Sequence, residues 1–274
     1  MDGSSRESMR AALGRFEELM GQAPDGAGAR DVSEGLYAVA GLLDREPSLR
    51  RALTDPASSP DSRRGLVDAL FGSQLPGLPL SVLRGLVSSP WHSPADLREA
   101  VETLAAQAAL TAAEGDGVLD DVEDELFRFA RLLDREPELR TALTDPGLPD
   151  DRKTGLIRTL LGERAQPATV RLVEVVVTRP RGRSIESSLE ELSRLAAARR
   201  QRLVAEVRVA RPLALDQAQR MADALARIYG RAVQLQISVD PQVLGGVRVR
   251  VGDEVLDGTV ARRLQDVRRR LTAG

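Results

Sequence analysis

The chain has 274 residues, 42% of them hydrophobic and 29% charged, a balance typical of a globular protein of about two domains. Its formal net charge is −2, and the absence of cysteine excludes disulfides, thiolate metal sites and a cysteine nucleophile. Because aromatic residues make up only 3%, the cores must consist mainly of Leu, Val, Ala and Ile.

Apolar spacing and the positions of proline predict that the first two hundred residues are helical. The first helix is expected over residues 4–20, where Met9, Leu13 and Phe16 share one face. A loop rich in Gly, Ala and Pro is expected over 22–30. The remaining helices are predicted at 31–44, 48–53, 60–72, 80–87, 95–114, 119–133, 138–143, 150–161, 168–178 and 185–200.

The hydrophobic period changes after residue 202 from that of a helix to that of a strand. Alternation predicts strands at 203–209, 233–239 and 247–251 and a short fourth one at 255–256, with helices at 216–229 and 259–271. The expected fold class is α+β. It is mostly α-helical, with an N-terminal helical part that contains an internal repeat and a small C-terminal α+β domain.

The helical part contains a duplication. The segment LLDREPSLRRALTDP, Leu42–Pro56, returns ninety residues later as LLDREPELRTALTDP, Leu132–Pro146, with only two differences in fifteen positions. A looser match at the same offset relates about 31–90 to about 121–180. The repeat keeps apolar spacing and turn residues, which indicates a unit of packing and not an active site.

Candidate catalytic and ligand-binding patterns are weak. His92, the only histidine, is expected in a turn, because one histidine without cysteine makes no zinc site. The acidic run Asp120–Glu125 lacks the spacing of a calcium loop, and Gly245-Gly246 lacks the pattern of a phosphate loop. The run Arg268–Arg270 has no interleaved aromatic residues. We therefore expect no catalytic residue, metal, cofactor or nucleic-acid partner.

The segment DPQVLGGVRVRVGDEVLDGTVARRL, Asp240–Leu264, resembles the C-terminal signature of the δ subunit of F-type ATP synthases, called oligomycin-sensitivity-conferring protein in mitochondria. The residues that carry this signature are Leu244, Gly245, Gly246, Val247, Gly252, Asp253, Asp257, Gly258, Arg263 and Leu264. The resemblance extends back to Leu97 and spans a whole subunit of the usual family length. The residues before it read as an extra copy of the helical domain, as in actinobacterial members.

The resemblance implies a mechanical role and no catalysis. A δ subunit belongs to the peripheral stalk, or stator, of the proton-translocating ATP synthase. It joins the top of the α3β3 head, where it meets β subunits and the N-terminal helices of α subunits, to the stalk subunit b. With no run of about 18 apolar residues and no signal-peptide pattern, we expect a peripheral protein on the cytoplasmic face of the cell membrane, without direct membrane insertion.

The resemblance also divides the chain. Residues 1–96 would be the extra partial bundle, 97–200 the six-helix N-terminal domain and 201–274 the stalk-binding α+β domain. The groove for an α-subunit tail would lie between the first and fifth helices of the six-helix domain. Its expected residues are Leu97, Val101, Leu104, Ala105, Ala108, Val170, Val173 and Val177.

Other interpretations remain open at this stage. The apolar faces assigned to the groove can equally be ordinary helix core. The whole chain can be a helical-repeat adaptor unrelated to ATP synthesis, although that leaves the 240–264 pattern unexplained. An enzyme would need a carboxylate or a metal-oxygen mechanism.

Overall fold

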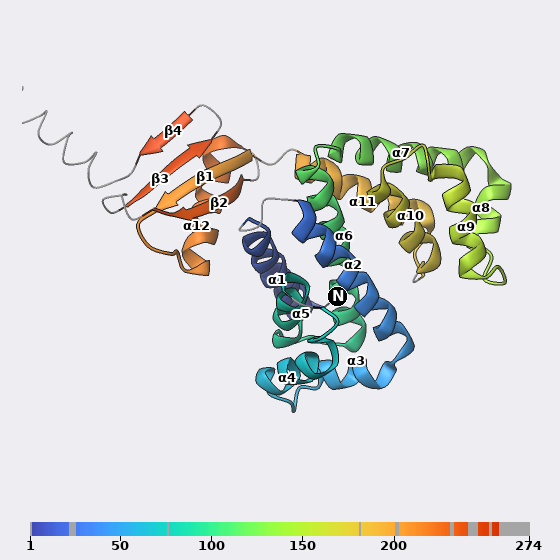
Figure 1. The fold of residues 1–274 in the computed structure, drawn as a ribbon, viewed down its shortest axis with the longest axis horizontal. Helices are drawn as coiled ribbons and strands as arrows, with labels where there is room; N and C mark the ends of the chain where they lie inside the picture. Colours follow the sequence, from blue (N-terminus) through green and yellow to red (C-terminus); the bar gives the residue numbers. More distant parts are fainter. Residues whose placement is uncertain are drawn as a thin grey trace, which may run out of the picture. The chain divides into compact units, whose positions relative to one another are not determined.

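The structure is a computed structural model that describes residues 2–21, 26–75, 77–180, 182–200, 203–230, 233–240, 246–251 and 254–257. The chain divides into two compact units. The first consists of Met1–Ala12 and Asp25–Arg200, and the second of Leu13–Pro24 and Gln201–Gly274. Figure 1 shows a helical part and a part with a β-sheet, so the predicted α+β fold class is confirmed.

The described residues before Arg200 form helices joined by short turns (Figure 1). Their bounds are α1 (Gly3–Gly21), α2 (Gly26–Arg45), α3 (Pro47–Thr54), α4 (Pro60–Phe71), α5 (Leu78–Ser88), α6 (Pro94–Gly115), α7 (Leu119–Arg135), α8 (Pro137–Thr144), α9 (Asp150–Leu161), α10 (Pro167–Thr178) and α11 (Ile185–Arg200).

Serine and proline mark several helix starts. Ser59 and Ser93 precede Pro60 and Pro94, and their hydroxyls accept hydrogen bonds from the backbone N–H groups of Ser62 and Asp96 at 3.1 and 3.2 Å. These bonds satisfy N–H groups that have no partner within the helix, while proline supplies a helical φ at a position where its missing N–H does no harm.

The duplication seen in the sequence is also present in three dimensions, and it is longer than predicted. Helices α1–α5 correspond in order to α6–α10 at an offset of about ninety residues, which adds α1 and α6 to the repeat. The bounds of α3 and α8, and of α4 and α9, match at that offset. Helix α2 packs along α6, as α7 packs along α11, so α6 and α11 occupy equivalent places.

Helix α6 belongs to both copies. It is the partner of α2 in the first, and it stands at the start of the second, where it contacts α7, α10 and α11. All seven residues from Leu104 to Leu110 are buried, so every face of the helix is covered there. Alanines dominate this stretch, because small side chains let helices approach from several sides, and a helix apolar all round is suited to burial.

An ion pair recurs in the two copies with its charges exchanged. In the first copy Arg84 on α5 donates through Nε to Asp68 on α4 at 2.5 Å. At the equivalent positions of the second copy, Arg158 on α9 donates to Glu174 on α10 at 2.6 Å. In each copy this hydrogen bond raises the pKa of the arginine above its ordinary value. The repeat therefore keeps an ion pair between the two equivalent helices, although the acid and the arginine have exchanged helices.

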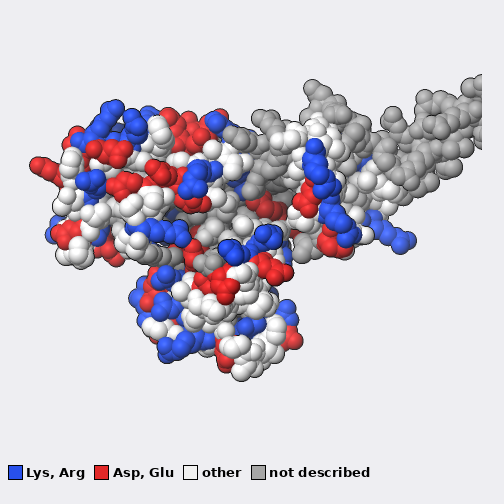
Figure 2. All heavy atoms as spheres, turned by 180° about the vertical axis from the view of Figure 1, so that it is seen from behind, with Lys and Arg blue, Asp and Glu red and all other residues white. Residues whose placement is uncertain are grey.

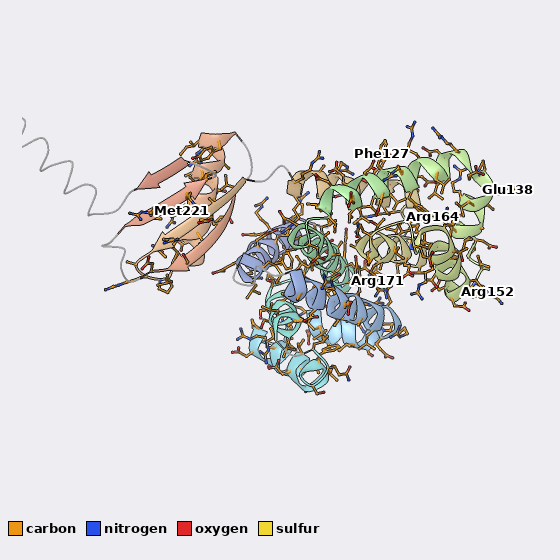
Figure 3. The ribbon with its side chains drawn as sticks, turned by 45° about the horizontal axis from the view of Figure 1, so that its top comes forward. Phe127, Glu138, Arg152, Arg164, Arg171 and Met221 are labelled. Carbon is orange, nitrogen blue, oxygen red and sulfur yellow. The ribbon has the colours of Figure 1, made fainter. Side chains whose placement is uncertain are left out.

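Equivalent positions on α2 and α7 differ in environment. Tyr37 is 2% exposed; its ring lies 5.4 Å from the Arg171 guanidinium, and its carbonyl accepts a hydrogen bond from Arg179 at 3.2 Å. The counterpart Phe127 is 57% exposed (labelled in Figure 3) and lies 5.9 Å from Arg131 of its own helix. Arg131 replaces Gly41, where a Cβ would lie 2.7 Å from Arg179. Helix α7 thus has the polar outer face of a terminal repeat.

The second unit contains a four-stranded sheet in the order β2-β1-β3-β4. The strands are β1 (Leu203–Val209), β2 (Val233–Val239), β3 (Val247–Val251) and β4 (Glu254–Asp257), and α12 (Leu215–Tyr229) connects β1 to β2. This connection makes β1 and β2 parallel, while β3 is antiparallel to β1 and to β4. Figure 1 shows α12 on one face of the sheet.

The core of this unit follows from the alternation of the strands. Ala205, Val207 and Val209 of β1 are buried beside Val249 and Val251 of β3, and Leu225 of α12 completes the cluster. Intervening polar residues face the other way, where Arg250 of β3 donates to Glu206 of β1 at 2.5 Å and lowers the pKa of that carboxyl. The parity of apolar residues therefore sets which face of the sheet α12 covers.

One predicted boundary differs from the structure, and one predicted helix lies where the structure gives no description. The loop predicted over 22–30 is too long, because α2 already begins at Gly26 and Ala29 is 1% exposed. Burial of Ala29 in the first turn outweighs the low helix propensity of Gly26 and Gly28. The helix predicted at 259–271 lies outside the described residues.

Substitution of Tyr37 and of its counterpart Phe127 tests whether α2 belongs to an interior copy of the repeat and α7 to a terminal one. Replacing Tyr37 with Ala is expected to lower the free energy of unfolding by about 3 kcal/mol, because it leaves a cavity under Arg171. Replacing Phe127 with Ala removes an exposed ring and is expected to cost less than about 1 kcal/mol. Urea unfolding followed by circular dichroism measures both; equal losses would contradict the assignment of interior and terminal copies.

The division between residues 96 and 97 stays a prediction, and deletion of residues 1–90 tests it. We expect a fragment 91–274 that is helical by circular dichroism but melts at a lower temperature than the full chain. The reason is that α6 loses the cover of α2, α3 and α5 and exposes apolar surface. A fragment with no cooperative melting transition would show that the copies form one inseparable core.

Candidate functional site

The predicted groove residues come from two helices that touch, α6 and α10, but the structure places nearly all of them inside the helical unit. Among the predicted residues only Val170 of α10 is half-buried. The others are at most 1% exposed: Leu97, Val101, Leu104, Ala105, Ala108, Val173 and Val177. These side chains are therefore buried within this chain, and their role in a groove stays a prediction.

Helix α2 of the first copy lies beside this pair and accounts for part of the burial. It packs along α6 and reaches α10 through the contacts of Tyr37 with Arg171 and Arg179. Burial lowers the pKa of Arg179 from its ordinary value although the charge of Asp44 opposes the shift. Arg179 therefore lies at the contact between the two copies of the repeat.

A cavity of about 160 Å³ lies where α2, α6 and the start of α10 converge. Its apolar wall is formed by alanines of α6 and α10, and its rim by an ion pair between Arg30 and Asp116 at 2.6 Å. The alanines that line it are Ala109, Ala112, Ala113 and Ala168. Sequence reasoning missed them, although the run AAQAALTAA, 105–113, signals an apolar surface wider than one helical stripe.

Residues of the C-terminal signature are only partly described. Gly246 has φ of 81°, a conformation that favours glycine, and it leads directly into β3 at Val247. The backbone of Asp257, at the end of β4, lies opposite that of Arg248 in the register of β3 and β4. The remaining signature residues lie outside the described part of the chain: Leu244, Gly245, Gly252, Asp253, Gly258, Arg263 and Leu264.

The second unit exposes apolar side chains that the sequence reading did not single out. Ile228 near the end of α12 is 67% exposed, and Val239 at the end of β2 is 51% exposed. Alternation within β2 places Val239 in phase with Val233, Leu235 and Ile237, which pack against the core, so the pattern predicts burial and gave no signal of exposure. Single exposed apolar residues are also common on protein surfaces. They are candidates for contact with a partner only in combination with other observations.

The described surface carries both basic and acidic side chains. On the face shown in Figure 2, basic and acidic side chains are interspersed over the helical part. His92 is a surface residue in the turn before α6, with its Nδ1 3.2 Å from a carboxylate oxygen of Asp2. Among the described residues, no group of three or more His, Asp or Glu side chains could hold a metal ion.

None of the helices in the described ranges combines the length and the apolar character needed to cross a lipid bilayer. The longest of them, α6, has 22 residues and carries five charged side chains: Asp96, Arg98, Glu99, Glu102 and Glu114. Its burial is explained by helix packing within the unit.

Comparison with known proteins places these features in a family. Residues 103–271 match the family model described as ATP synthase delta (OSCP) subunit. The chain is 51% identical over 271 residues to the ATP synthase subunit delta of Streptomyces avermitilis, covering 99% of this chain and 98% of that protein. It is 50% identical to that of a Parafrankia strain, covering 99% and 100%, and 49% identical to that of Streptomyces coelicolor, covering 100% and 99%.

These relatives match the chain over nearly its whole length, including the first copy of the repeat that precedes the family-model match. The resemblance inferred from residues 240–264 is thereby confirmed. The chain belongs to the ATP synthase delta (OSCP) subunit family.

Proposed function

We propose that the chain is a non-catalytic subunit of the peripheral stalk of the proton-translocating F-type ATP synthase. In this role it links the top of the α3β3 head to the b stalk, so that the head does not turn with the rotor. The observation that carries the proposal is the likeness to proteins named ATP synthase subunit delta over at least 98% of their length. A tether needs rigid units and extended contacts and requires no general base or nucleophile.

The two compact units support a division of labour. The helical unit would bind the N-terminal helices of α subunits and contact β subunits, and the α+β unit would bind the end of subunit b. The protein would then lie at the cytoplasmic face of the cell membrane as a peripheral part of the complex. A mechanical link must dissociate slowly, which favours interfaces with large buried area.

The exposure of the predicted groove residues limits the surface of α6 and α10 on which a partner helix could dock. Val170 is the accessible member of the predicted set, and the cavity lined by Ala109, Ala112 and Ala168 adjoins the same helices. An amphipathic helix binds by placing a few apolar anchors into such a surface. We therefore centre the proposed α-tail contact on Val170 and this cavity, and assign the buried members of the set to its support.

Co-purification tests the stator role. A tagged chain expressed in its own cells is expected to recover the α, β and b subunits from gently solubilised membranes. A variant that ends before Leu203 lacks the α+β unit and is expected to keep α but lose b. Recovery of soluble partners alone would favour the alternative, a helical-repeat adaptor unrelated to ATP synthesis.

Calorimetry tests the helix-docking surface. A synthetic peptide with the sequence of an α-subunit N-terminal helix is expected to bind the purified chain. Replacing Val170 with Asp places a charge in the apolar contact and should weaken binding by about tenfold or more. Thr159→Asp, on the exposed side of α9, adds the same charge elsewhere and should leave the affinity unchanged. Equal affinities for both variants would exclude this surface.

A further inference from the structure

A second cleft lies in the helical unit, away from the α2–α6–α10 cavity. It has a volume of about 490 Å³ and is bounded by α8, α9, the end of α10 and the start of α11. Leu143, Val177 and Ile185 form an apolar floor of buried side chains. Among the described residues of the lining, three are cationic, Arg140, Lys153 and Arg183, and one is acidic, Glu186. Neither the family resemblance nor the proposed stator role assigns a function to this cleft.

Lys153 is the unusual member of this lining. It is the only lysine among 39 basic residues, and it is 6% exposed. Its ammonium group makes no hydrogen bond or ion pair with any residue that the structure describes, although it lines the cleft. The side chain as a whole is nearly buried, whereas the ammonium group at its tip opens on the cleft, where an anion can approach it. An anion that entered the cleft would supply the missing partner.

The first copy of the repeat shows how an equivalent cation is satisfied within the chain. Arg63 occupies the position of Lys153 and is also 6% exposed. Its Nη2 lies 3.5 Å from the carbonyl oxygen of Ser88, in the last turn of α5, toward which it donates. Lys153 makes no such contact with the end of α10, so its charge is available to the cleft.

The surroundings of the second-copy cleft are also more positive. Arg183 stands where the first copy has Ser93, and it is held by an ion pair with Glu99 of α6 at 2.6 Å. Ser184 follows it and caps α11, accepting a hydrogen bond from the backbone of Ser187 at 3.1 Å. The N-terminal end of this 16-residue helix therefore borders the cleft and adds a favourable dipole for an anion. Glu186 opposes this field.

We propose that this cleft binds an oxyanion of about the size of phosphate, with Lys153 as its central partner. Arg140 from α8 and Arg183 from the turn before α11 would flank the anion, and the hydroxyls of Thr144 and Ser184 would be within the same lining. The oxyanion is either free inorganic phosphate or the carboxylate of an acidic side chain on a bound protein. Both carry the charge and the acceptor oxygens that lysine and arginine recognise.

Isothermal titration calorimetry of the full chain at low ionic strength tests the proposal, with inorganic phosphate as the first probe. Low salt is needed because screening weakens charge recognition. Saturable binding is expected in the wild type. Lys153→Met retains the unbranched stem without the charge and should bind phosphate at least about tenfold more weakly. Arg152→Met is the matched control, since Arg152 is an exposed neighbour on the same helix (Figure 3).

A second substitution covers the case in which Lys153→Met fails to fold. Arg183→Ser introduces the residue that the first copy carries at this position and should also weaken phosphate binding. Acetate in place of phosphate distinguishes the source: tighter binding of acetate indicates a protein carboxylate, and tighter binding of phosphate indicates the free ion. Absence of saturable binding of either anion to the wild type, or equal binding by wild type and both cleft variants, would overturn the proposal.

Discussion

Helix α6 is enclosed on all sides by helices from both copies of the repeat, and the helical unit depends on this double packing. Its contacts with α2, α3 and α5 complete the first copy, and those with α7, α10 and α11 begin the second. Such a position requires a helix that is apolar all round with side chains small enough for close approach, which the alanine-rich run 105–113 provides. Two bundles that share a helix cannot move independently without breaking a buried interface.

The duplication shows how one sequence pattern is adapted to two environments. Tyr37 lies at the junction of the copies beneath Arg171, whereas Phe127 lies on the outer face of α7. The same comparison pairs Gly41, which leaves room for Arg179, with Arg131, which covers an exposed ring. Small residues are found where another copy follows, and charged residues where the array ends, as expected for repeats that stack through nearest-neighbour contacts.

Side-chain chemistry within the repeat is less constrained than geometry. The link between α4 and α5 is an Asp68–Arg84 pair, and the link between α9 and α10 is Arg158–Glu174 with the charges exchanged. Either polarity holds two neighbouring helices, because the attraction depends on the product of the charges. At Arg63 and Lys153, in contrast, the exchange of one cation for another changes which partner the group can reach. A stabilising contact in one copy thus becomes an open, positively charged cleft in the other.

The amino-acid sequence by itself determined the class of every described element and most of their bounds to within two residues, because apolar period and proline position act locally. The strands at 203–209, 233–239 and 247–251 agree residue for residue with the structure. It also determined the repeat and, through residues 240–264, the family. The start of α2 was missed because burial of Ala29 overrides the local preference of its neighbouring glycines.

Only the tertiary structure decided which apolar faces are accessible. A period of 3.6 residues identifies a face that is buried, but it does not say whether a second face of the same helix is covered by a distant segment. For this reason the sequence did not reveal that the expected groove residues of α6 are buried within the chain, and the alanines around Ala109 and Ala112 were not predicted. The cleft at Lys153 was hidden for the same reason, since its lining combines α8, α9, α10 and α11, whose side chains converge only when the helices pack.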